Sequence, residues 1–168
     1  NATDDKYFSH ARVRLLQAEQ LLDAIGSATG TAEKFPNLPV GTPAVALPDG
    51  EYKHPFLEAF GRPARAMACE CERDSDTNLG QALQLVGGGM VQDKIHRDAG
   101  RVARLIGSGR DNAGLAEELF LATLSRYPSR QERDVLVRRL DRAGTKRRRV
   151  AEDILWALIN HNEFLFQH

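Results

Sequence analysis

Apolar residues are most densely patterned near the C-terminal end of the chain. From Val150 onward they recur at intervals of four, and residues 154–159 are apolar without a break. A helix with so wide an apolar stripe buries most of its surface instead of lying on an exterior face. We therefore predict a core helix here, with Trp156 buried and the other helices packed around it.

Two helices are predicted immediately before this one. Residues 112–125 carry apolar positions at helical spacing, and Ser129 with Glu132 has the spacing of a capping box at the start of the next helix. Gly144 is expected to end that helix, and Thr145 is expected to cap the core helix. The apolar row that should face inward from the capped helix is Val135, Leu136 and Leu140.

The N-terminal half predicts shorter helices and one irregular segment. A helix is expected over Ala18 to Thr29, with Gly30 loosening its end. Residues 31–53 contain four prolines, which interrupt a helix, but the segment is too apolar for a free linker. We expect it to form an extended strap over the helices, with one short strand around residues 44–47. Further short helices are predicted over residues 55–60, 79–86, 90–96 and 98–106.

These elements predict an all-α fold. The expected architecture is a compact multi-helix bundle, with the strap of residues 31–53 between the first long helix and the rest. A chain of 168 residues is long enough to bury one real hydrophobic core. We therefore expect residues 1–168 to form a single helical domain.

The charge distribution limits the classes of partner. The 23 basic and 23 acidic residues balance, so no overall field favours nucleic acid or a membrane surface. Because no apolar run reaches about 18 residues, we expect no membrane-spanning helix. Residues 126–149 hold ten basic and three acidic residues. Aromatic residues suited to base stacking are not interleaved with them, so we interpret this region as a solvated helix face and a basic turn; a nucleic-acid partner is not favoured.

The sharpest chemical feature is the motif Cys69-Glu70-Cys71-Glu72-Arg73. It contains the only two cysteines, which excludes a disulfide framework. The thiols could be small buried structural side chains, a strained disulfide, or ligands of a soft metal with His54 or His10. Zinc normally takes four ligands and no second cysteine pair exists, so Cys69, Cys71 and His54 are only weak metal candidates. Structural thiols are the favoured interpretation.

Charged residues around the cysteines complete this candidate motif. Arg62 could pair with Glu70 or Glu72, since arginine binds carboxylates in a bidentate manner. A structural staple is favoured over a site for an anionic ligand. No catalytic residue is assigned, because the chain lacks a Gly-rich phosphate loop, a Ser-His-Asp order and a zinc-protease motif. Haem attachment would need Cys-x-x-Cys-His, so we expect no cofactor in this domain. The candidate motif is therefore Arg62, Cys69, Cys71, Glu72 and Arg73.

Five stretches, in order along nearly the whole chain, resemble one protein family. The family is the planctomycete PSD-one domain, a domain of unknown function (number fifteen-fifty-three), and the resemblance is to its C-terminal part. The stretches are Tyr7–His10 with Ala18–Ile25, Phe56–Pro63, Cys69–Arg73, Leu121–Pro128 and Trp156–Phe166.

The resemblance implies where such a domain occurs in a larger protein, and it implies no reaction. Such domains stand at the C-terminus of large bacterial proteins that are exported to the periplasm or cell surface. They commonly follow a second domain of unknown function, and often a cytochrome c-like or immunoglobulin-like module. The resemblance implies no activity, so no catalytic residue is carried over from the family.

Two functions from different classes are retained. The first is a non-catalytic structural or interaction module that packs against the preceding domains of its parent chain or a protein partner, and it predicts an exposed apolar or charged patch around the strap. The second is a metal- or redox-linked accessory or enzyme domain centred on residues 69–73. Whether the chain is an enzyme is therefore left open. Carbohydrate binding is less favoured, because burial of Trp156 would leave only Tyr7, Tyr52 and Tyr127 to stack on sugars.

Overall fold

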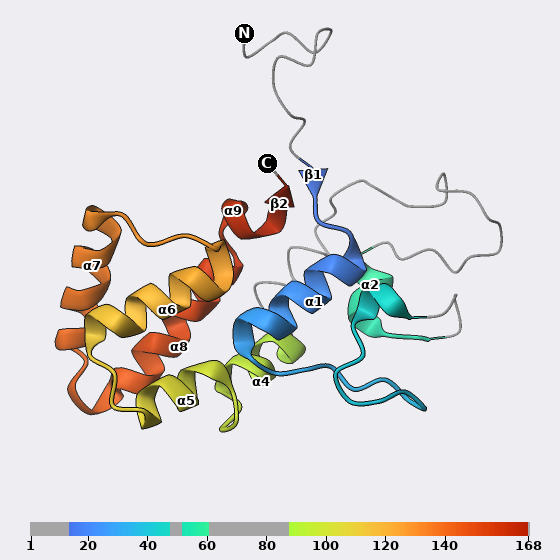
Figure 1. The fold of residues 1–168 in the computed structure, drawn as a ribbon, viewed down its shortest axis with the longest axis horizontal. Coiled ribbons are helices and arrows are strands. Elements are labelled where there is room, and N and C mark those ends of the chain that lie inside the picture. Colours follow the sequence, from blue (N-terminus) through green and yellow to red (C-terminus); the bar gives the residue numbers. More distant parts are fainter. Residues whose placement is uncertain (1–13, 48–51, 61–87, 168) are drawn as a thin grey trace, which may run out of the picture.

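The computed structural model describes residues 14–47, 52–60 and 88–167 (Figure 1). These residues are mostly helical, which confirms the predicted fold class. The helix expected over residues 79–86 and the motif of residues 62–73 lie outside the described residues. The elements are β1 (Arg14–Leu15), α1 (Ala18–Thr29), η1 (Ala44–Ala46), α2 (Pro55–Ala59), α4 (Gly89–His96), α5 (Arg101–Gly107), α6 (Asn112–Leu124), α7 (Arg130–Asp141), η3 (Gly144–Lys146), α8 (Arg147–Ile159), α9 (Asn162–Leu165) and β2 (Phe166–Gln167).

Helix α8 is the core helix that the apolar stripe predicts. It contacts α1, α4, α5, α6, α7 and α9, and its residues Ala151, Leu155 and Ile159 are fully buried. The prediction of a buried Trp156 is corrected, because this side chain is only half-buried. Around the axis of α8, Trp156 stands between the buried row that includes Leu155 and the exposed Ala157, so it lies at the edge of the apolar stripe. The stripe is therefore wide, but the neighbouring helices do not cover all of it.

Helices α6 and α7 form an antiparallel pair beside α8 (Figure 1). The predicted capping box is present: the Ser129 hydroxyl accepts from the Glu132 amide at 3.3 Å, and the Glu132 carboxylate accepts from the Ser129 amide at 2.7 Å. The predicted cap by Thr145 is wrong, because the residue before α8 is Lys146, at the end of the 3-10 turn η3, and no side chain caps the helix. Gly144 begins that turn with a φ of +51°, a value that favours glycine.

Helix α1 has the bounds that the sequence predicts. Gly30 ends it in the left-handed conformation, with a φ of +65°. Its last carbonyl groups are bound by α5, because the Arg101 guanidinium donates to the oxygens of Ala28 at 2.7 Å and Ser27 at 2.9 Å. This arginine satisfies backbone groups that a helix end otherwise leaves without partners.

The strap packs along α1, and its predicted short strand is wrong. Residues 44–46 form the 3-10 turn η1, since no neighbouring strand is available there among the described residues. Asp23 of α1 holds this turn, because its carboxylate accepts from the amides of Ala44 at 2.6 Å and Val45 at 3.1 Å. Phe35 is buried in the core, whereas Val45 remains 59% exposed. The strap is therefore anchored at selected positions, and Val45 remains exposed between them.

A minimal antiparallel pairing joins the two ends of the described chain. In β1 and β2, Arg14 is opposite Gln167 and Leu15 is opposite Phe166. The amide of Leu16 adds a bond to the carbonyl of Leu165 at 2.9 Å. Among the described residues, no helix combines the length and the apolar character that crossing a membrane requires.

The role of α8 as the core helix can be tested by truncating one of its buried side chains. Leu155→Ala should lower the free energy of unfolding by about 2–5 kcal/mol, because it removes buried methyl groups and leaves a cavity. Val135→Ala, on the exposed side of α7, is the control and should change it by no more than about 0.5 kcal/mol. Urea unfolding measures both changes. Equal effects of the two substitutions would contradict the assignment.

Candidate functional site

The sequence-predicted motif lies wholly outside the described residues. Arg62, Cys69, Cys71, Glu72 and Arg73 lie outside the described residues, so the structure places none of them. The metal, redox and staple hypotheses that depend on them stay predictions. His54 is the one member of the candidate metal set that the structure describes.

His54 lies at the start of α2, beneath the strap. Its side chain is 16% exposed, and its ring packs at 6.0 Å from the ring of Phe35. Its Nε2 lies 3.8 Å from the nearer carboxylate oxygen of Glu33. The other ring nitrogen, Nδ1, is buried and has no hydrogen-bond partner within the described part of the chain.

Lys94 of α4 also contacts the carboxylate of Glu33. Its side chain is only 4% exposed, and its ammonium lies 2.8 Å from Glu33 Oε2. It also donates to the carbonyl of Thr31 at 3.0 Å. His54 and Lys94 together lower the pKa of Glu33 from 4.5 to about 2, although partial burial acts in the opposite direction. This buried cation therefore ties α4 to the strap.

The surroundings of His54 bear on the metal hypothesis. Among the residues that the structure describes, no group of three or more His, Cys, Asp or Glu side chains comes together in a metal-binding arrangement. The carboxylate nearest His54 already pairs with Lys94, whose positive charge would compete with a cation. A metal site that includes His54 would therefore have to draw its other ligands from outside the described residues.

A second candidate site is an open groove where α6, α7 and α8 meet, at the opposite end of the bundle from the strap (Figure 1). Its volume is about 760 Å³. The floor is formed by the buried side chains of Phe120, Ile154 and Leu158. Val135 of α7 and Ala157 of α8 form apolar walls, and both are exposed. The groove therefore presents apolar surface to solvent between two helices.

This groove does not follow from the predicted inward row of α7, because that row included Val135. The structure corrects that prediction: Leu140 is buried and Leu136 is half-buried, but Val135 is 50% exposed. Leu136 and Leu140 are four residues apart and share a row, whereas Val135 lies about 100° around the helix from Leu136. The helical spacing alone therefore predicts that Val135 lies outside the row that contains Leu136 and Leu140.

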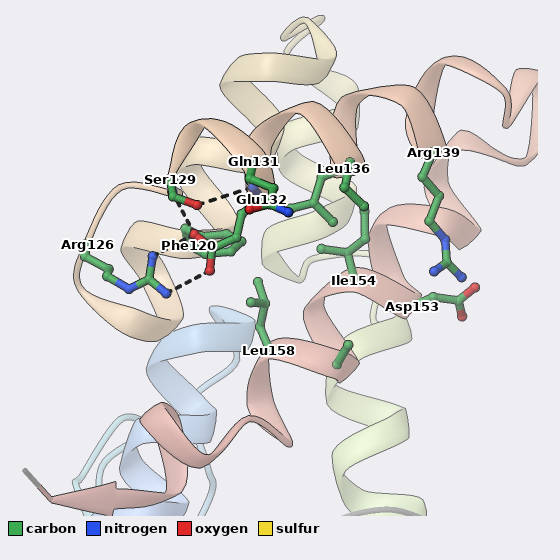
Figure 2. A pocket seen from close by; sticks show the side chains of 12 residues that line it. Phe120, Arg126, Ser129, Gln131, Glu132, Leu136, Arg139, Asp153, Ile154 and Leu158 are labelled. Atoms are coloured by element: carbon green, nitrogen blue, oxygen red, sulfur yellow. Dashed lines mark hydrogen bonds and ion pairs between the residues drawn. The ribbon is translucent and has the colours of Figure 1, made fainter.

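One end of the groove is closed by Arg126, which Figure 2 shows beside Glu132. The guanidinium of Arg126 binds the carboxylate of Glu163 at 2.6 and 2.9 Å and that of Glu132 at 3.0 Å through two nitrogens. It also lies 5.2 Å from the ring centre of Phe120. Both pairings are bidentate, which fixes the position and the plane of the guanidinium. We call Arg126, Glu132 and Glu163 the arginine clamp.

The clamp changes the proton affinity of all three groups. The hydrogen bonds of Glu163, and then those of Glu132, raise the pKa of Arg126. Arg126, with a further contribution from Ser129, lowers the pKa of Glu132 to about 2, and it also lowers that of Glu163. All three groups are therefore charged at neutral pH. Because they are partly exposed, solvent screening limits what they add to stability.

The other end of the groove is basic. Figure 2 shows Arg139 and Asp153 at this end, with Leu136, Ile154 and Leu158 between them and the clamp. Asp153 pairs with Arg149 at 3.6 Å. Arg142 and Lys146 are exposed near the same turn between α7 and α8. Within the described ranges, Arg139, Arg142 and Lys146 have no acidic side chain as an ion-pair partner.

One family model matches the chain. It covers residues 1–140 and is PSD1, described as a protein of unknown function (DUF1553). No curated protein and no solved structure matches the chain. The matched range includes α1 to most of α7, and it agrees with the family that the sequence motifs resemble.

The pairing of Glu33 with His54 and Lys94 predicts how the free energy of unfolding depends on pH in the acid range. Because the folded pKa of Glu33 is lowered from 4.5 to about 2, its contribution to stability is present above the unfolded value and is lost as the pH falls toward the folded value. Glu33→Gln should therefore destabilise the protein at neutral pH, and its difference from the wild type should shrink as the pH falls through that window.

Free energies of unfolding in urea, measured from about pH 7 to about pH 3, test this dependence. Glu58→Gln, at an exposed position of α2, is the matched control. A destabilisation by Glu33→Gln that stays constant over the whole range would contradict the assigned pairing.

Proposed function

The chain belongs to the PSD1 family of proteins of unknown function, and from that premise we propose that it is a non-catalytic interaction module. In this proposal, the groove between α6, α7 and α8 binds an amphipathic helix of a protein partner. The helix would belong to another domain of the same exported bacterial protein, or to a protein bound to it. The proposal assigns no cofactor to this domain and involves neither a membrane nor nucleic acid.

The observation that carries the proposal is the exposed apolar wall of the groove. Val135 is 50% exposed although the neighbouring row of α7 carries the half-buried Leu136 and the buried Leu140. Ala157 is exposed on the facing side of α8, and the floor between them is apolar. Exposed apolar surface that is contiguous and rimmed by charge is typical of a binding groove.

The dimensions and the rim favour a helix as the occupant. The groove is lined along α7 from Gln131 to Arg139, so this wall is about 12 Å long and matches about two turns of a bound helix. A bound helix would place its apolar row against the floor and its charged residues against the rim, as in other helix-in-groove complexes. The rim carries charges of both signs, the arginine clamp at one end and Arg139 with Asp153 at the other.

The chemistry of the groove also supports recognition more than reaction. The guanidinium and both carboxylates of the clamp bind one another. The hydroxyl of Ser129 accepts from the amide of Glu132, so it caps α7. These groups present fixed charge and shape to a ligand.

Binding of helical peptides tests the proposal. The probes are fluorescent stapled peptides of about 14 residues, with apolar residues at positions i, i+3, i+4 and i+7 and a varied choice of apolar side chain. Val135→Glu should weaken binding of the best peptide by about tenfold or more, because it places a charge in the apolar wall. Fluorescence anisotropy measures the dissociation constants.

Val45→Glu is the matched control, because Val45 is a similarly exposed valine on the strap. Its affinity for the same peptide should remain within about a factor of two of the wild type. Failure of every peptide to bind the wild type, or equal weakening by the two substitutions, would contradict the proposed function.

A further inference from the structure

The two ends of the groove differ in charge, and this difference would act on any helix bound between them. At the clamp, two carboxylates surround one guanidinium, so the end carries a net negative charge. Helices α6 and α8 also end on this side, at Leu124 and Ile159, whereas α7 begins here at Arg130, so two helix C-termini stand against one N-terminus. The C-terminus of a helix carries a partial negative charge. The clamp end is therefore the negative end of the groove.

The opposite end is positive. Val135, Arg139 and Arg142 are spaced by four and three residues, so they lie along one side of α7. On the facing helix, Lys146 precedes Val150 by four residues and Asp153 by seven, which places it on the side that bears Asp153 and Ala157. This end therefore holds four cations and two carboxylates. The carboxylates are Asp153 and, on another side of α7, Asp141, which accepts a hydrogen bond from Asn112 at 2.7 Å. The cations are Arg139, Arg142, Lys146 and Arg149.

We propose that the groove fixes the direction of the helix it binds, with the partner's N-terminus at the arginine clamp and an acidic C-terminal end at Arg139, Arg142 and Lys146. The inference rests on the proposed function, and it adds the orientation and the charge of the partner. The bound helix would run parallel to α7 and antiparallel to α8, since α7 begins at the clamp and α8 ends there.

Two electrostatic contributions act in the same direction. The helix macrodipole places a partial positive charge at the partner's N-terminus, beside the clamp, and a partial negative charge at its C-terminus, beside the cations. Glutamates in the partner's last turn would then pair with arginines that have no acidic side chain as partner in the described part of the chain. Surface pairs are weak individually, so several must act together to select one direction.

The partner's own helical preference opposes this arrangement. Acidic residues stabilise the N-terminal turn of a free helix and destabilise its last turn. A partner of the predicted kind would therefore be a poor helix in isolation and would gain order on binding. For this reason the test uses peptides that are stapled into helices before binding, so that a difference in affinity reports the groove and not the free peptide.

The experiment compares two stapled peptides of identical composition and identical apolar row. One carries glutamates in its last turn and lysines in its first, and the other has these positions exchanged. The peptide with C-terminal glutamates should bind the wild-type protein about tenfold more tightly at low ionic strength. The preference should shrink as salt is added, because the charges are exposed.

Charge reversal at the basic end should remove the preference. The double variant Arg139→Glu with Arg142→Glu alters exposed side chains outside the arginine clamp, so the fold is retained. It should bind the two peptides equally or prefer the one with N-terminal glutamates. The double variant Lys34→Glu with Lys53→Glu changes the net charge by the same amount at exposed positions of the strap. This control should keep the wild-type preference.

The outcomes separate the two proposals. If neither peptide binds the wild-type protein, the proposed function itself is overturned. If both bind with equal affinity, or if the Arg139 and Arg142 reversal leaves the preference unchanged, the groove binds helices but does not fix their direction. A preference that both double variants lose equally would reflect the total charge of the protein, and it too would overturn the inference.

Discussion

Burial of one face of α8 is the constraint on which the rest of the described structure depends. The row of Ala151, Leu155 and Ile159 is in contact with helices from both halves of the chain and is fully removed from water. A charged residue of the same helix, Glu152, is buried as well, and its carboxylate binds Arg148 at 2.9 Å and lies 3.5 Å from His96. Because a buried carboxylate is costly without partners, these contacts also fix how α4 lies against α8.

The same constraint explains why the two ends of the bundle differ. Near the strap, polar anchors from α1 and α4 hold an irregular segment against the core: Asp23 binds η1, and Lys94 binds Glu33. Near α7, the apolar stripe of α8 extends further around the helix than its neighbours cover, and the side that bears Ala157 remains open. The groove is therefore a consequence of a stripe that is wider than the surface available to bury it.

Local patterns in the sequence predicted the parts of the fold that local forces determine. The bounds of α1 and the capping box of Ser129 and Glu132 follow from residues within one or two turns of each other. The arginine clamp did not follow, because Arg126 and Glu163 are 37 positions apart. Both lie in stretches that resemble the family, but the resemblance assigns no contact between them. The burial of Lys94 could not be predicted either, because lysine is normally a surface residue of an amphipathic helix. Its partner, the carbonyl of Thr31, is 63 positions away. The 3-10 turn at residues 44–46 likewise depends on a carboxylate of α1 that its own sequence does not contain.

Native-state hydrogen exchange tests the central role of α8 most directly. If burial of this helix organises the domain, the amides of Leu155, Leu158 and Ile159 should exchange only through global unfolding and be among the slowest in the protein. Amides of α7, which has one buried residue, should exchange faster through local opening. Faster exchange in α8 than in α7 would contradict the account, because it would mean that the bundle holds together while its central helix opens.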